Sequence, residues 1–124
     1  MPVVHTPPGH THEVPGTRFT SLATPSRGST ETSVWLVEID AGTTATPHEV
    51  SREEVFVVLE GTADVLIGDE RSSAAPGDAI VVPAGVPFEL QPAGGGGLRA
   101  LCCLPVGGRA TLADGSSFAP PWSL

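Results

Sequence analysis

The sequence predicts an all-β fold, arranged as a β-sandwich or a barrel in one domain. Helical periodicity is scarce along the 124 residues, and 15 Gly and 13 Pro separate short apolar runs. About eight runs of this kind, several of them rich in β-branched residues, are typical of a sandwich or a barrel. The chain is long enough to bury one hydrophobic core.

The predicted strands follow one another with turn residues between them. In chain order they are residues 17–24, 32–39, 46–50, 54–60, 62–68, 78–83, 87–91 and 98–105. The second strand has Trp35 alternating with Val37, and a short polar turn separates the third strand from the fourth, which contains the apolar run VFVVL. The sequence IGDE forms a hairpin turn after the fifth strand, the turns APGD and PAGVP bound the sixth, and GGGG is a flexible connection between the last two.

The two ends of the chain differ in composition from its middle. Residues 1–16 and 107–124 are polar and rich in Pro and Gly. We therefore predict an N-terminal arm that is mobile or crosses to a partner subunit, a barrel over residues 17–106, and a C-terminal tail packed on the barrel or on a partner.

Composition excludes several classes of function. The net charge is −8, which argues against a nucleic-acid or anionic-membrane partner. The chain has no Lys for a Schiff base or a Walker loop, and no Tyr to act as an acid or base. No segment approaches the roughly 18 apolar residues of a membrane span, and no signal-peptide pattern begins the chain. The adjacent Cys102 and Cys103 make no disulfide framework, so we expect a reduced, cytoplasmic protein.

One histidine and one glutamate are the candidate functional residues. Only His48 of the four histidines lies in the body of the sequence, and Glu54 opens the apolar strand 54–60. If the strands 46–50 and 54–60 pair as a hairpin and Phe56 faces the interior, alternation turns Glu54 inward as well. A buried carboxylate is costly without a partner. We therefore predict that His48 and Glu54 converge inside the barrel as a pair.

The spacing of these residues resembles the cupin family. One cupin motif reads G-x5-H-x-H-x3-E-x6-G, and Gly42, His48, Val50, Glu54 and Gly61 reproduce its spacing, with Val50 in the place of the second His.

A second cupin motif, G-x5-P-x-G-x2-H-x3-N, is matched farther along the chain. Gly77, Pro83 and Gly85 fit it, while Phe88 replaces its His and Pro92 replaces its Asn. The resemblance covers residues from about 17 to 106 and implies a double-stranded β-helix, the jelly-roll barrel of small single-domain cupins, usually as a homodimer.

The resemblance also bears on metal binding. In the family, the three His and the Glu of the two motifs hold an Fe, Mn, Ni or Zn ion. Here only His48 and Glu54 remain of those four, and two protein ligands seldom hold such an ion firmly. A divalent metal would need extra ligands, for which His10 and His12 are the candidates.

The remaining site predictions concern the ligand. Five residues are predicted to line the barrel and contact it, namely Trp35, Val50, Phe56, Phe88 and Cys102. A wall with Val50 and Phe88 in place of two histidines suits an apolar, aromatic or alicyclic small molecule.

Three functions stay open. One is a small-molecule enzyme of the isomerase, cyclase or dehydratase (lyase) type, in which His48 and Glu54 transfer protons. Another is a variant metal-dependent oxygenase or Lewis-acid catalyst. The last is a non-catalytic ligand-binding or sensor module.

Overall fold

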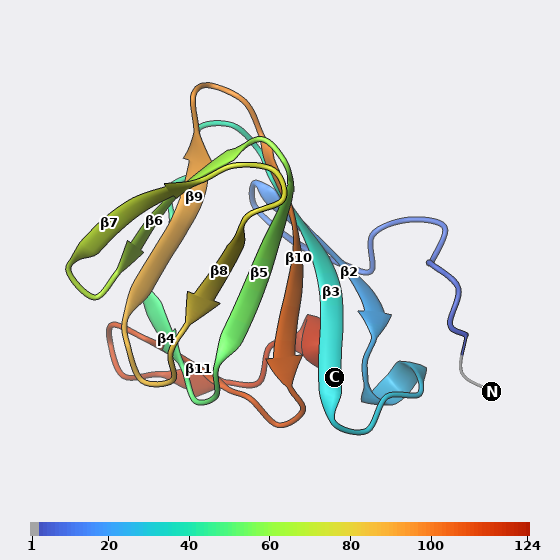
Figure 1. Ribbon diagram of the computed structural model, residues 1–124. Coiled ribbons are helices and arrows are strands. Elements are labelled where there is room, and N and C mark those ends of the chain that lie inside the picture. The colour runs from blue at the N-terminus through green and yellow to red at the C-terminus, as the bar shows by residue number, and fades with distance from the viewer. Residues whose placement is uncertain (1–2) are drawn as a thin grey trace.

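The computed structural model describes residues 3–124 and contains two six-stranded antiparallel sheets that face each other (Figure 1). The first sheet has the order β1 (His12–Val14), β2 (Thr17–Ala23), β3 (Thr32–Ile39), β10 (Leu98–Pro105), β5 (Glu54–Glu60) and β8 (Ala79–Val82). The second has the order β12 (Ser117–Phe118), β11 (Ala110–Leu112), β4 (His48–Val50), β9 (Phe88–Ala93), β6 (Thr62–Ile67) and β7 (Glu70–Ala74). Two short 3-10 helices, η1 (Pro25–Arg27) and η2 (Pro121–Ser123), complete the fold.

The predicted all-β jelly-roll barrel is confirmed, and its core follows from strand alternation. Every second side chain is buried throughout β10 and over the first five or six residues of β5 and β3, because successive residues of a strand point to opposite faces. Phe56 and Val58 of β5 therefore face the interior together with Trp35 and Val37 of β3. Among the described residues no helix is long and apolar enough to cross a membrane.

All eight predicted strands are present, but the predicted hairpin between residues 46–50 and 54–60 is wrong. β4 pairs with β9 and β11, whereas β5 pairs with β10 and β8, so the two strands belong to opposite sheets. The turn at residues 51–53 carries the chain from one sheet to the other. His48 and Glu54 consequently approach each other across the interior and not along one sheet.

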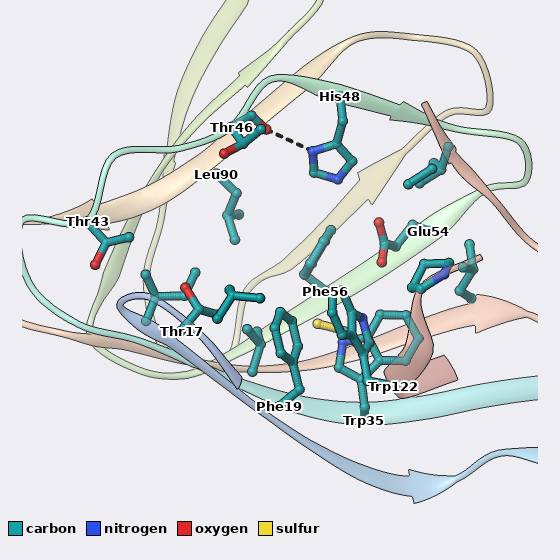
Figure 2. A pocket seen from close by; sticks show the side chains of 18 of the residues that line it. Thr17, Phe19, Trp35, Thr43, Thr46, His48, Glu54, Phe56, Leu90 and Trp122 are labelled. Carbon is teal, nitrogen blue, oxygen red and sulfur yellow. Dashed lines mark hydrogen bonds between the residues drawn. The ribbon is translucent and has the colours of Figure 1, made fainter. Parts of the chain in front are cut away.

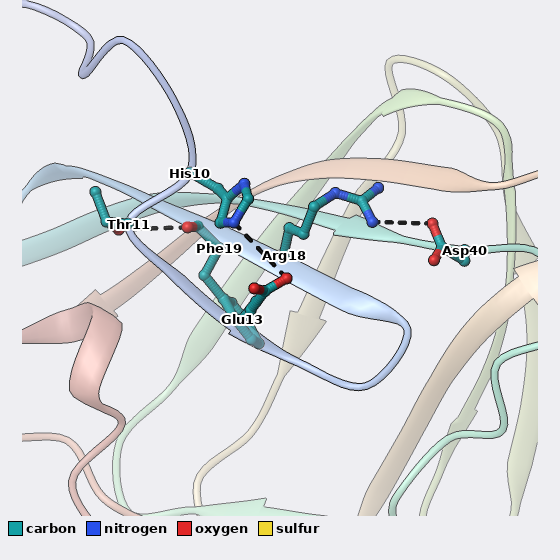
Figure 3. Close-up of polar contacts among 6 residues, drawn as sticks. All are labelled: His10, Thr11, Glu13, Arg18, Phe19 and Asp40. Carbon is teal, nitrogen blue, oxygen red and sulfur yellow. Dashed lines mark hydrogen bonds and ion pairs between the residues drawn. The ribbon is translucent and has the colours of Figure 1, made fainter.

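The N-terminal segment is less separate from the barrel than its composition suggests. His12–Val14 form β1, which pairs with β2 as the edge of the first sheet, so the barrel begins before the predicted boundary at residue 17. Figure 3 shows Arg18 of β2 reaching Asp40, 3.1 Å away, and His10 lying 3.7 Å from Glu13. The Arg18–Asp40 contact links the β1–β2 hairpin to the end of β3, whereas the His10–Glu13 contact lies within the N-terminal segment.

The C-terminal tail completes the barrel wall. β11 pairs with β4, and the Trp122 ring stacks on Phe19 with a centroid separation of 3.6 Å and an interplanar angle of 3°. The Ser21 hydroxyl donates a hydrogen bond of 2.7 Å to the Trp122 carbonyl, and the Ser33 hydroxyl donates one of 2.6 Å to the Ser123 carbonyl. Residues 121–123, which form η2, are therefore fastened onto β2 and β3.

Candidate functional site

A cavity of about 260 Å³ lies between the two sheets, and Figure 2 shows the side chains that surround it. Exposed residues such as Val14, Thr46 and Phe118 mark its mouth, and buried residues such as Trp35 and Phe56 form its inner wall. The remaining lining residues are Pro15, Thr17, Phe19, Val37, Ile39, Thr43, Thr44, His48, Val50, Glu54, Leu90, Cys102, Leu104, Ala110, Leu112, Pro120 and Trp122. This wall is mostly apolar, as is usual for small-molecule sites.

His48 enters the cavity from β4 with its orientation fixed by the backbone. Its Nδ1 lies 2.9 Å from the Thr46 carbonyl oxygen (Figure 2). Because a carbonyl oxygen can only accept, Nδ1 must carry the proton of this hydrogen bond. Phe88 packs against the imidazole with a centroid separation of 4.4 Å. Nε2 is therefore the ring nitrogen left free for a ligand.

Glu54 faces His48 from the opposite sheet. The side chain lies at the start of β5, is only 5% exposed and lines the cavity. The described residues give its carboxyl group no hydrogen-bonding or cationic partner. Burial away from water raises the pKa of Glu54 from 4.5 to about 8. The carboxyl group is therefore protonated at neutral pH and can donate a hydrogen bond into the cavity.

The predicted His48–Glu54 pair is thus brought to one cavity but not into direct contact. No ion pair or hydrogen bond joins the two side chains in the described part of the chain, and they point toward each other from β4 and β5 (Figure 2). The Thr46 carbonyl, and not an ionised Glu54, fixes the tautomer of His48. Space between the imidazole and the carboxyl group is open to a ligand.

Four of the five predicted ligand-contacting residues line the cavity. Trp35, Val50, Phe56 and Cys102 are buried and belong to its wall. Phe88 does not line it. Although it occupies the predicted inward position and is 2% exposed, it packs against His48 and against Phe56, whose ring centroid lies 6.0 Å away. Phe88 supports the wall from behind.

Cys102 and Cys103 point to opposite faces of β10. Cys102 is fully buried on the cavity side, and Cys103 is half-buried on the other face. Burial, and secondly the negative charge that an ionised Glu54 would carry, raise the pKa of the Cys102 thiol well above its usual value. Cys102 is therefore a neutral apolar wall residue and a poor nucleophile.

The donor atoms near the cavity do not form a cupin metal centre of the usual type. Val50 and Phe88 fill the two vacant ligand positions and are each 2% exposed. Neither His10 nor His12 lines the cavity, and within residues 3–124 no three or more His, Cys, Asp or Glu side chains are grouped to hold an ion. Of the cupin motif ligands, His48 and Glu54 alone line the described cavity, which is too few for firm binding.

Several wall residues escape prediction from the sequence. Phe19 and Trp122 come from the two ends of the chain, outside the motifs. Thr17, the first residue of β2, and Thr43, in the loop after β3, also line the cavity. Strand alternation offers a signal for Phe19, because residues 17–24 are predicted as a strand. No local pattern predicts that Trp122 folds back onto β2.

Comparison with known proteins identifies the family of this chain. The family model described as "Cupin domain" matches residues 35–104. An uncharacterised protein of Streptomyces coelicolor is 41% identical over 59 residues, which are 48% of this chain and 56% of that protein. The chain therefore spans little more than half the length of this relative.

Solved structures show the same fold. The polyketide cyclase RemF of Streptomyces resistomycificus superposes with a TM-score of 0.73 at 21% identity, over 95% of this chain and 82% of that one. KdgF of Halomonas sp. superposes with a TM-score of 0.67 at 22% identity, over 78% and 86% of the two chains. Two sheets, both motif frameworks and the family match agree, and the chain belongs to the cupin family.

Proposed function

We propose that this cupin is an enzyme that moves a proton on a small apolar or aromatic molecule held in its cavity, in a reaction of the isomerase, cyclase or dehydratase type. The observation that carries the proposal is the arrangement of two unlike groups across an apolar space. His48 presents a free Nε2 from one sheet, and the unpartnered Glu54 faces it from the other.

His48 acts as the base in this proposal. The Thr46 carbonyl holds Nδ1–H, so Nε2 offers its lone pair to a C–H bond of the ligand. When that bond breaks, the proton moves to Nε2 and the electron pair stays on the ligand. The positive charge on the imidazole is then stabilised by the hydrogen bond to Thr46.

Glu54 acts as the acid on the other side of the ligand. Its protonated oxygen donates to the ligand atom on which negative charge develops, and the proton transfers to that atom as the C–H bond breaks. Return of the His48 proton to a different carbon, with return of the other proton to Glu54, gives an isomer and restores both residues. The same two transfers would assist ring closure or loss of water.

Structural likeness supports the reaction class. RemF is a polyketide cyclase by name, and its fold covers nearly all of this chain. The homodimer and the cytoplasmic location that the sequence suggests are part of the proposal and stay predictions.

Hydrogen–deuterium exchange tests the proposal even while the product is unidentified. A panel of compact carbon acids would be incubated with the protein in D2O at pH 7, and deuterium uptake would be followed by mass spectrometry. We expect exchange that falls by roughly 100-fold or more in His48→Gln and in Glu54→Gln, as is usual when a general acid or base is removed. Glu53→Gln is the matched control, because Glu53 neighbours Glu54 but is exposed.

Two results would overturn the proposal. Exchange that is equal in the wild type and in both variants would show that neither residue moves a proton. If compounds bound in the cavity but took up no deuterium, the protein would be a ligand-binding module and not an enzyme.

A further inference from the structure

The charges around the cavity restrict what it can hold. The chain has no Lys, and none of its arginines lines the cavity. Arg52 lies in the exposed turn after β4, and Arg109 lies beside β11 with its Nε 3.2 Å from the Ser117 hydroxyl. A ligand carboxylate or phosphate inside the cavity would therefore meet no permanent cation, and burying an unpaired anion is costly.

Glu54, the buried acid in the described cavity wall, favours a neutral ligand group that can accept a hydrogen bond. Glu54 lacks a hydrogen-bonding partner among the described residues, although it is 5% exposed and surrounded by apolar side chains. An unpaired carboxyl group in such surroundings is held in its neutral form, which carries one O–H donor. A neutral acceptor on the ligand, such as a carbonyl oxygen, would satisfy this donor.

The shape of the wall favours flat rings. Phe19 and Trp122 lie parallel, and Trp35 and Phe56 belong to the same side of the cavity (Figure 2). Aromatic rings prefer offset-stacked or edge-to-face partners, so such a wall stabilises a planar aromatic ligand. A volume of about 260 Å³ lies just below the range of roughly 300–1,000 Å³ found for ligand pockets, which favours a compact ligand of one or two rings.

We infer that this cavity selects compact, neutral aromatic ketones over aromatic carboxylates, with the ligand carbonyl accepting a hydrogen bond from Glu54 and its rings held against Phe19, Trp35 and Trp122. The inference rests on the same site as the proposed function and names its substrate class. Selection comes from the missing cation as much as from the donor, because an anion loses its hydration and meets no Lys or Arg in the cavity wall.

Three naphthalenes that differ only in one substituent test the selection. Equilibrium dialysis at pH 7 would compare 2-acetylnaphthalene, 2-naphthoate and 2-isopropylnaphthalene against the full chain. We expect the ketone to bind roughly 10-fold more tightly than the hydrocarbon, which is the order of one net hydrogen bond. We expect it to bind at least about 30-fold more tightly than the carboxylate.

Two variants assign the selection to Glu54. Glu54→Gln keeps an N–H donor of similar size, so the ketone should keep its advantage over the hydrocarbon. Glu54→Leu removes the donor, so the ketone and the hydrocarbon should bind equally. Glu53→Gln is the matched control and should bind all three compounds as the wild type does.

The inference is overturned if the wild type binds 2-naphthoate as tightly as 2-acetylnaphthalene, or if it binds none of the three compounds. This outcome is independent of the proposed reaction, because dialysis requires no turnover. Ketone selection without deuterium exchange would remove the proposed function alone. Exchange on carbon acids without ketone selection would remove this inference alone.

Discussion

Glu54 should contribute a loss of stability as the pH rises, and Glu54→Gln should remove that contribution. Below pH 4.5 the carboxyl group is protonated in both the folded and the unfolded chain, so its titration does not affect the balance. Between pH 4.5 and about 8 it ionises in the unfolded chain but stays protonated in the barrel. Rising pH therefore stabilises the unfolded state in this window, and the loss stops once the folded protein also ionises.

The size of the effect follows from the pKa difference. Each pH unit between the unfolded and folded pKa values is worth about 1.4 kcal/mol. A pKa raised from 4.5 to about 8 therefore corresponds to a loss of roughly 5 kcal/mol in unfolding free energy across the window. That is a large share of the roughly 5–15 kcal/mol that stabilises an ordinary domain. The carboxamide of Glu54→Gln does not ionise and escapes this loss.

Urea denaturation followed by tryptophan fluorescence would measure the unfolding free energy at each pH, since Trp35 and Trp122 are the two tryptophans of the chain. The difference in unfolding free energy between Glu54→Gln and the wild type should be smallest at pH 4 and grow by several kcal/mol by pH 8. Taking this difference cancels the titration of other groups, such as Asp114, whose pKa is lowered by hydrogen bonds from Ser116. The unfolding free energy of Glu53→Gln should change with pH in the same way as that of the wild type. If Glu54→Gln also followed the wild type at every pH, Glu54 would not be protonated in the folded barrel and the reasoning would be refuted.

Four further outcomes are expected. Phe88→Ala should cost about 3–5 kcal/mol in urea denaturation, because this 2%-exposed ring supports the wall, and a cost below about 1 kcal/mol would contradict that role. Gly61→Ala should be more destabilising than Gly77→Ala: both glycines have positive φ, but a Cβ on Gly61 would overlap the Gly97 carbonyl oxygen, whereas Gly77 has open space around it. Metal analysis of the purified protein should find well below one equivalent of Zn, Fe, Mn or Ni, and a full equivalent would revive the metal-dependent alternative. Light scattering at micromolar concentration should show a dimer, and a monomer alone would remove the predicted homodimer.

The fold could be predicted from the sequence because its signals are local. Apolar alternation and the turn residues mark eight strands, and their ends lie within two residues of those observed. β7 was missed because its sequence, ERSSA, is polar and its first four residues are exposed at a sheet edge. β1, β11 and β12 were missed because each has at most three residues and depends on a partner strand that no local pattern identifies.

The candidate site could be predicted only in part, for the same reason. Motif spacing and alternation led to His48 and Glu54, and both reach the cavity. Whether they touch depends on which sheet each strand joins, and the crossing between β4 and β5 is decided by pairing across the whole barrel. Phe88 points inward, as its motif position predicts, but it does not line the cavity, because the rings of His48 and Phe56 cover it. The spacing of residues in the sequence does not predict such contacts between side chains of different strands.

The stack of Phe19 on Trp122 places part of the ligand wall outside the segment that carries His48 and Glu54. His48 and Glu54 lie inside the segment matched by the family, residues 35–104, whereas both stacked rings lie outside it. Substitutions near the two ends of the chain could therefore reshape this part of the wall while His48 and Glu54 keep their supporting strands. Relatives with this division could diverge in what they bind without changing His48 or Glu54, and exchanging the terminal segments between such relatives would transfer the part of the ligand preference that the two stacked rings set.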